Sequence, residues 1–185
     1  MRKLLAILAA MSLSVTSWGA AGWYQDYITA SVDGGADGYY WIGSDPSFGT
    51  QFAGANFGNV VTLEFGSDMR YWGDEPGDAR EGGAFYYRID GGSYTEVIWT
   101  HTDIGGNDWQ GLAPTTVNVA QSLAAGAHTV DVYAKSWGQG LGDSLLGSEG
   151  SPFSASFTVV PEPATMALFG LGVIGVVAYR RRQQA

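Results

Sequence analysis

The sequence predicts an all-β fold, an antiparallel β-sandwich of about eight strands. Aromatic residues make up 14% of the chain and glycine occurs 28 times, a composition typical of strands joined by tight turns. Short apolar segments alternate with polar residues at a period of two, as in strands with one buried face. Between the two ends of the chain, no segment sustains apolar residues at the spacing of a helix.

The clearest local pattern is a hairpin in the middle of the chain. Residues 84–90 alternate between apolar and polar, and residues 93–100 form a second extended segment. Gly91 and Gly92 separate the two segments. Because glycine adopts positive φ at little cost, we expect a tight turn with these two glycines at its centre.

The remaining strands are expected on both sides of that hairpin. Residues 128–135 alternate strictly, which indicates a strand with one face in the core. Further strands are expected at residues 60–65, 153–160, 24–32, 38–42 and 115–119. Residues 87–92 and 123–134 resemble segments of secreted immunoglobulin-like and jelly-roll modules, a resemblance that bears on the fold alone.

Composition excludes several classes of function. The chain has no cysteine, which excludes disulfides, thiolate metal sites and cysteine nucleophiles. Its net charge is −9, and residues 22–160 alone hold four basic residues against 17 acidic ones. An acidic domain of this kind repels nucleic acid, so we expect no nucleic-acid partner. The same charge favours solubility and attracts divalent cations.

The N-terminus, residues 1–21, has the features of a secretory signal peptide. Arg2 and Lys3 precede an apolar segment at residues 4–15, which is too short to span a bilayer comfortably. Small residues follow up to Ala21, as at signal-peptidase sites. We therefore expect a signal helix that is removed on export.

The C-terminus, residues 161–185, has three features in a fixed order. Pro161, Glu162 and Pro163 come first, an uncharged apolar segment at residues 164–179 comes second, and the third is an arginine cluster of Arg180, Arg181 and Arg182. The apolar segment predicts a transmembrane helix. Because positive residues stay in the cytoplasm, residues 22–160 are expected to form one extracytoplasmic domain.

This C-terminal segment resembles the PEP-CTERM sorting signal of Gram-negative bacteria. The resemblance implies an exosortase-type enzyme as processing partner and a transient contact with the membrane. It implies an exported precursor anchored in the inner membrane, and then a destination at the cell surface or in the extracellular matrix. Proteins with this signal commonly accompany exopolysaccharide and biofilm formation.

Aromatic residues beside turns suggest carbohydrate binding within that domain. Six tryptophans remain in residues 22–160, and flat rings next to Asp and Asn side chains could stack on sugars. The alternative is that these rings fill the core, as we expect for Trp99, which alternates with Val97. The candidate sugar-binding residues are Tyr71, Trp72, Asn107, Asp108, Trp109 and Trp137.

Acidic turns suggest calcium binding, because Ca²⁺ takes six to eight oxygen ligands. The densest cluster consists of Asp74, Glu75, Asp78 and Glu81. The alternative is that these acids are ordinary turn residues.

No pattern of catalytic residues stands out. His101 and His128 are the only histidines, and no G-x-S-x-G motif occurs. His128 begins an alternating strand, so we expect a structural residue with both ring nitrogens paired. The sequence therefore favours a non-catalytic surface protein, with matrix polysaccharide as a partner. The alternatives are a structural or adhesion protein without a sugar site, and a small polysaccharide-active hydrolase or lyase.

Overall fold

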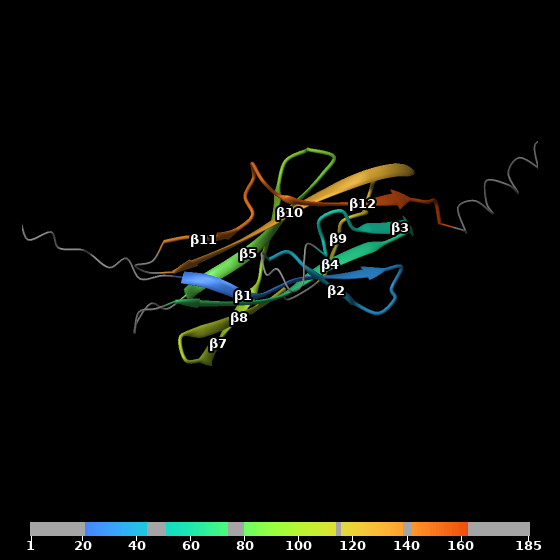
Figure 1. The fold of residues 1–185 in the computed structure, drawn as a ribbon. Helices are drawn as coiled ribbons and strands as arrows, with labels where there is room; N and C mark the ends of the chain where they lie inside the picture. Colours follow the sequence, from blue (N-terminus) through green and yellow to red (C-terminus); the bar gives the residue numbers. More distant parts are fainter. Residues whose placement is uncertain (1–20, 44–50, 74–79, 114–115, 139–141, 163–185) are drawn as a thin grey trace, which may run out of the picture.

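A computed structural model describes residues 21–43, 51–73, 80–113, 116–138 and 142–162 (Figure 1). Their regular elements are twelve strands in two sheets. The expected all-β sandwich is confirmed, with more strands than the sequence pattern indicated. The expected terminal helices lie outside the described residues, and within those residues no helix has the length and hydrophobicity of a membrane span.

The first sheet, called sheet A, has the strand order β2-β1-β4-β8-β7, with β9 paired to β4. All its pairs are antiparallel. Its strands are β1 (Ala21–Val32), β2 (Gly38–Trp41), β4 (Leu63–Gly73), β7 (Thr100–Gly105), β8 (Asp108–Leu112) and β9 (Val117–Asn118).

The second sheet, called sheet B, has the order β3-β12-β10-β5-β6, with β11 paired to β10. It is antiparallel except where β12 runs parallel to β3. Its strands are β3 (Asn56–Val60), β5 (Arg80–Ile89), β6 (Thr95–Ile98), β10 (Gly126–Gly138), β11 (Ser144–Leu146) and β12 (Phe153–Val159).

The strand expected at residues 60–65 is two strands in different sheets. The chain leaves β3 of sheet B and enters β4 of sheet A across Val61 and Thr62. Asp33 holds this crossing, because its Oδ1 atom accepts hydrogen bonds from the amides of Val61 (2.6 Å) and Thr62 (2.8 Å). The apolar pattern of residues 60–65 therefore gives no sign that the chain changes sheets there. Asp33, about thirty positions earlier, stabilises this crossing.

The central hairpin also differs from the expectation by one residue. The residues with positive φ are Asp90 (51°) and Gly91 (70°), and the amide of Gly92 donates to the carbonyl of Ile89 at 2.9 Å. The turn is therefore centred on Asp90-Gly91. An Asp tolerates left-handed backbone better than most residues, and its side chain has a further role described below.

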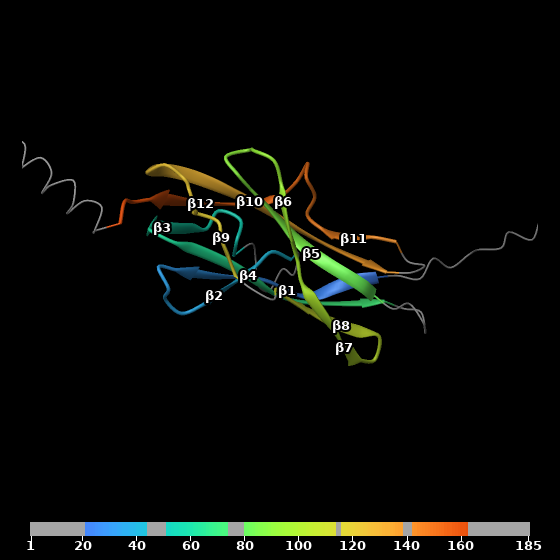
Figure 2. The same cartoon turned by 180° about the vertical axis from the view of Figure 1, so that it is seen from behind.

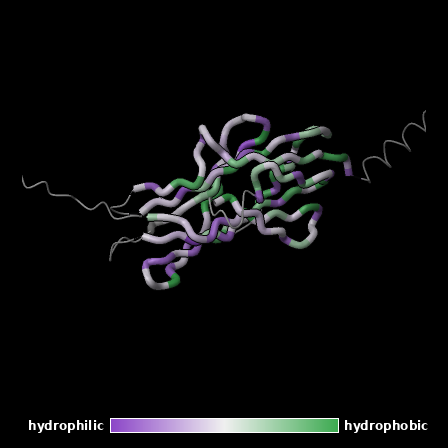
Figure 3. The backbone as a smooth tube through the Cα atoms, in the orientation of Figure 1, coloured by the Kyte–Doolittle hydropathy of each residue, from purple (hydrophilic) through white to green (hydrophobic). Residues whose placement is uncertain are grey.

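The segment expected as one strand at residues 93–100 is divided at Trp99. Strand β6 belongs to sheet B and β7 to sheet A, so the chain crosses the sandwich at this tryptophan. The amide of Trp99 donates to the carbonyl of Gly83 at 3.1 Å. Beyond it, β7 and β8 form a hairpin that is largely hydrophilic in Figure 3.

The indole of Trp99 lies in the core between the two sheets, where 3% of the residue is exposed, as the sequence predicted. Gly83 of β5 and Gly111 of β8 face it from opposite sheets. A Cβ atom on Gly111 would lie 2.5 Å from Nε1 of Trp99, and one on Gly83 would lie closer still to the ring. Trp99 thus fills a slot that two glycines leave open.

The same pairing of tryptophan with glycine recurs on the outer faces. Trp72 is the cross-strand partner of Gly22 in sheet A, and Trp137 is the partner of Gly82 in sheet B. A Cβ on either glycine would lie 2.8 Å from the facing indole. An aromatic ring that covers a glycine of the next strand shields that backbone from water. Because tryptophans pack on glycines at these positions, the fold uses the two residue types together.

One acidic side chain points into the core. Asp26 of β1 is 3% exposed and pairs in register with Met69 of β4. Among the residues that the structure describes, its Oδ1 atom has no hydrogen-bond partner. Burial raises the pKa of Asp26 to about 7, because a charged carboxylate is poorly solvated there.

Replacing Gly111 with alanine should destabilise the fold by about 1–3 kcal/mol, because Trp99 is enclosed and cannot move away from the new methyl group. The control is Gly150→Ala, since a Cβ on Gly150 meets nothing within 4 Å. Urea unfolding of both variants measures the difference. Equal stabilities would show that the Trp99 slot tolerates a side chain.

Replacing Asp26 with asparagine should remove a pH dependence of stability. Because folding raises the pKa of Asp26, its contribution is most favourable below about pH 4 and is lost as the pH rises towards 7. The expected loss is on the order of 4 kcal/mol for three pH units. Urea unfolding between pH 4.5 and 7.5 should show a slope for the wild type that Asp26→Asn lacks. Parallel curves would contradict the pKa assigned to Asp26.

Candidate functional site

The structure separates the aromatic residues that the sequence placed side by side. Successive residues of a strand point to opposite faces, so Tyr71 faces the core while Trp72 faces outwards. Tyr71 and Trp109 are 0% and 6% exposed, and their rings stack at a centroid distance of 6.4 Å. Neither ring offers a free face on which a sugar could stack.

The other candidate residues lie at three places. Asn107 is an exposed turn residue between β7 and β8, with a φ of 64°. Asp108 begins β8 directly opposite Trp72. Trp137 lies on the outer face of sheet B, away from Trp72 on sheet A. The structure therefore brings together Trp72 and Asp108 but not Trp137.

The calcium hypothesis stays a prediction. Asp74, Glu75 and Asp78 lie outside the described residues, and so does the side chain of Glu81. Within the described part of the chain, no group of three or more His, Asp or Glu side chains could hold a metal ion.

Trp72 lies within a mixed aromatic and polar surface on the outer face of sheet A. We call this surface the sheet A face. It arises because alternate residues of β4 point outwards, and β1 and β8 flank them in register. Its residues are Tyr24, Gln25, Asp68, Arg70, Trp72, Asp108 and Gln110.

Polar contacts organise the sheet A face. Gln110 donates from Nε2 to Oδ1 of Asp68 at 2.9 Å. Tyr24 lies near Asp108, and the pKa of Tyr24 is raised first by burial and then by the negative charge of that carboxylate. Nε of Arg70 is buried, with no hydrogen-bond partner within the described residues. The guanidinium lies on the same face of β4 as Trp72, because the two residues are two positions apart.

Sequence reasoning missed most of this face, because the pattern of β4 is unusual. Residues 66–73 alternate, but the inward positions include a serine and the outward positions include a tryptophan. Glycines at both ends obscured the strand further. A search for period-two alternation without regard to hydrophobicity would have placed Asp68, Arg70 and Trp72 on one face.

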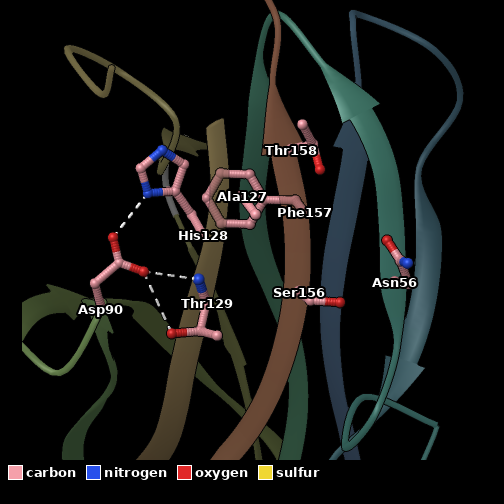
Figure 4. A pocket seen from close by; sticks show the side chains of 8 residues that line it. All are labelled: Asn56, Asp90, Ala127, His128, Thr129, Ser156, Phe157 and Thr158. Atoms are coloured by element: carbon pink, nitrogen blue, oxygen red, sulfur yellow. Dashed lines mark hydrogen bonds and ion pairs between the residues drawn. The ribbon is translucent and has the colours of Figure 1, made fainter. Parts of the chain in front are cut away.

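A second candidate is a hollow of about 310 Å³ near the end of sheet B (Figure 4). His128 lies at its rim with both ring nitrogens occupied. Nδ1 is 2.7 Å from Oδ2 of Asp90, and Nε2 is 2.9 Å from the carbonyl oxygen of Ala124. Because both partners are acceptors, this arrangement favours the protonated imidazolium form, in which both nitrogens donate. This confirms the expected structural histidine.

The charge state of this pair follows from its contacts. The pKa of Asp90 is lowered, mainly by the hydrogen bond from the amide of Thr129 (2.8 Å) and then by His128. The pKa of His128 is raised, first by Asp90 and then by the Ala124 carbonyl. Ser156 points away from His128 in Figure 4, and its hydroxyl lies 3.4 Å from the carbonyl oxygen of Ala55. The hollow thus holds no serine activated by this histidine.

The C-terminal end of sheet B leads directly into the sorting segment. Val159 is the last residue of β12, and the amide of Val160 donates to the carbonyl of Val60 at 2.9 Å. Pro161 and Glu162 follow and are exposed, whereas Pro163 and Arg180 to Arg182 lie outside the described residues. Residues 159–182 match the family profile of the PEP-CTERM protein-sorting motif.

The chain carries a PEP-CTERM sorting motif. The motif marks an exported protein of a Gram-negative bacterium, made as a membrane-anchored precursor and sorted by an exosortase. No curated protein matches the chain.

Replacing His128 with glutamine should lower the melting temperature most near pH 5–6. The raised pKa of His128 gives stability that is present below about pH 6.5 and lost as the pH rises through the folded value. The lowered pKa of Asp90 gives stability that is lost in acid. Because the pair is partly exposed, the shift should be no more than roughly 4 °C. A difference that does not vary between pH 4 and 9 would contradict the imidazolium.

Proposed function

We propose that the protein is a non-catalytic component of the cell surface that holds polysaccharide of the extracellular matrix on the sheet A face. The observation that carries the proposal is the position of Trp72. One side of its indole covers Gly22, and the half-buried ring lies on the outer face among hydrogen-bonding side chains. A flat apolar ring beside polar groups suits a sugar, which has an apolar C–H face and a rim of hydroxyls.

The polar residues of the sheet A face suit the hydroxyls of such a ligand. Asp68 and Asp108 are hydrogen-bond acceptors, and Gln110 already orients Asp68. Arg70, on the same face of β4, adds guanidinium N–H donors. Because these groups come from adjacent strands rather than loops, little ordering is needed on binding.

The titratable groups favour binding over catalysis. Both ring nitrogens of His128 are held, one by Asp90 and the other by the Ala124 carbonyl, so neither is free to take a proton from a ligand. Asp26 has a raised pKa, but it is buried and faces the core, out of reach of a polymer. Neither His128 nor Asp26 can therefore serve as the accessible acid or base that glycoside hydrolysis needs.

One observation favours a purely structural or adhesion protein instead. Trp41, Trp99 and Trp109 are each less than 10% exposed, so half of the tryptophans in the domain serve the core. The two functions differ in whether Trp72 contacts a ligand.

Replacing Trp72 with alanine should weaken polysaccharide binding by about tenfold, because the stacking surface is lost. Affinity gel electrophoresis of residues 21–162 against a panel of polysaccharides measures the retardation. Trp137→Ala is the matched control, because Trp137 covers Gly82 in the same way on the outer face of sheet B. It should bind like the wild type.

If no polysaccharide retards the wild-type domain, the structural or adhesion function is favoured instead. Equal loss of retardation in both variants would show that stability, rather than a sugar contact, explains the effect.

A further inference from the structure

The sorting motif begins inside a paired strand. Val159 is in register with Gly126 of β10 and with Val60 of β3, and the amide of Val160 is bonded to the Val60 carbonyl. Only Pro161 and Glu162 separate this hydrogen bond from Pro163. The folded domain and the motif therefore have no linker between them.

A hollow of about 390 Å³ lies beside these residues. Figure 2 shows that β12 ends at the end of the sandwich where the chain leaves it. One wall is the end of β12 with Pro161 and Glu162. The opposite wall is the connection from β9 of sheet A to β10 of sheet B, residues 118–125, of which Gln121, Ser122 and Leu123 line the hollow.

Hydrogen bonds fix the wall opposite the motif. Oδ1 of Asn118 accepts from the amides of Leu63 (3.3 Å) and Ala120 (3.0 Å). The amide of Val119 donates to the carbonyl of Leu63 at 2.8 Å. Ser122 has a φ of 64° and is exposed at the tip. This wall of the hollow is therefore held by hydrogen bonds to Leu63, the first residue of β4.

We propose that the processing enzyme docks on this end of the domain, with the hollow as part of its recognition surface. Three residues in extended conformation reach about 10 Å at most. To enclose Pro161 to Pro163, the enzyme needs a cleft about as deep as this reach. The walls of such a cleft would then contact the domain next to the motif. Leu123 and Val61 offer apolar contact, and Gln121, Ser122 and Glu162 offer polar contacts.

The proposal concerns recognition by the enzyme and is independent of polysaccharide binding. It predicts that the rate of processing depends on the surface of residues 118–125, although these residues lie outside the motif itself. It also predicts that a longer separation between the motif and the domain slows processing, because the enzyme then loses its contact with the domain.

The test uses the full chain in a cell that has an exosortase, and follows loss of the C-terminal segment by pulse-chase and gel electrophoresis. The first variant, Gln121→Glu with Ser122→Asp, adds two charges to the rim of the hollow. It should slow processing by about threefold or more, as charge changes at the rim of an interface slow association. Aspartate tolerates the left-handed backbone of Ser122.

The matched control is Thr102→Glu with Asn107→Asp, on the β7–β8 hairpin. It likewise changes one exposed residue of ordinary backbone and one exposed residue with a φ of 64°. This hairpin lies towards the opposite end of the sandwich (Figure 1). The control should be processed at the wild-type rate, and melting temperatures of all variants should agree.

A second variant inserts a Gly-Ser linker of about eight residues between Val160 and Pro161. If the enzyme docks on the domain, this linker variant should be processed more slowly than the wild type. Adding Gln121→Glu and Ser122→Asp to the linker variant should then have no further effect. Faster processing would show that the domain obstructs the enzyme, and would overturn the proposal. Wild-type rates for both the rim and the linker variants would overturn it as well.

Discussion

The relation between the two sheets depends on the slot that holds Trp99. The indole occupies the space between Gly83 of sheet B and Gly111 of sheet A, at the residue where the chain crosses from one sheet to the other. Trp23 and Tyr71 pack around it, each at a centroid distance of 6.0 Å. A ring enclosed by backbone on two sides sets the spacing of the two sheets where β5 faces β8.

The outer faces use the same pairing with a different result. Trp72 and Trp137 each cover a glycine of the neighbouring strand, but on the surface the second side of the ring is not enclosed by another sheet. A tryptophan that stabilises the sheet can therefore also contact a ligand. On sheet A the neighbours of the ring are polar and include Asp108 and Arg70, which is why that face, rather than sheet B, is the candidate for sugar binding.

The two candidate surfaces lie at opposite ends of the sandwich. Trp72 pairs with Gly22 near the start of β1, whereas the sorting motif follows the end of β12, and these two strand ends point in opposite directions in Figure 1. In a precursor held by its C-terminus, the end next to the motif faces the processing enzyme. The sheet A face around Trp72 then lies at the end of the sandwich away from the motif.

The sequence by itself determined the sorting motif, the all-β class and most of the strands, because these depend on local order and on a period of two. It also predicted that Trp99 lies in the core and that both ring nitrogens of His128 have hydrogen-bond partners. Tertiary structure decided where the strand at residues 60–65 divides, since Asp33 stabilises that crossing from a distant turn. It also decided which tryptophans face outwards: Tyr71 and Trp72 are adjacent in sequence but lie on opposite faces, and only the pairing of β4 with β1 and β8 shows what surrounds each ring.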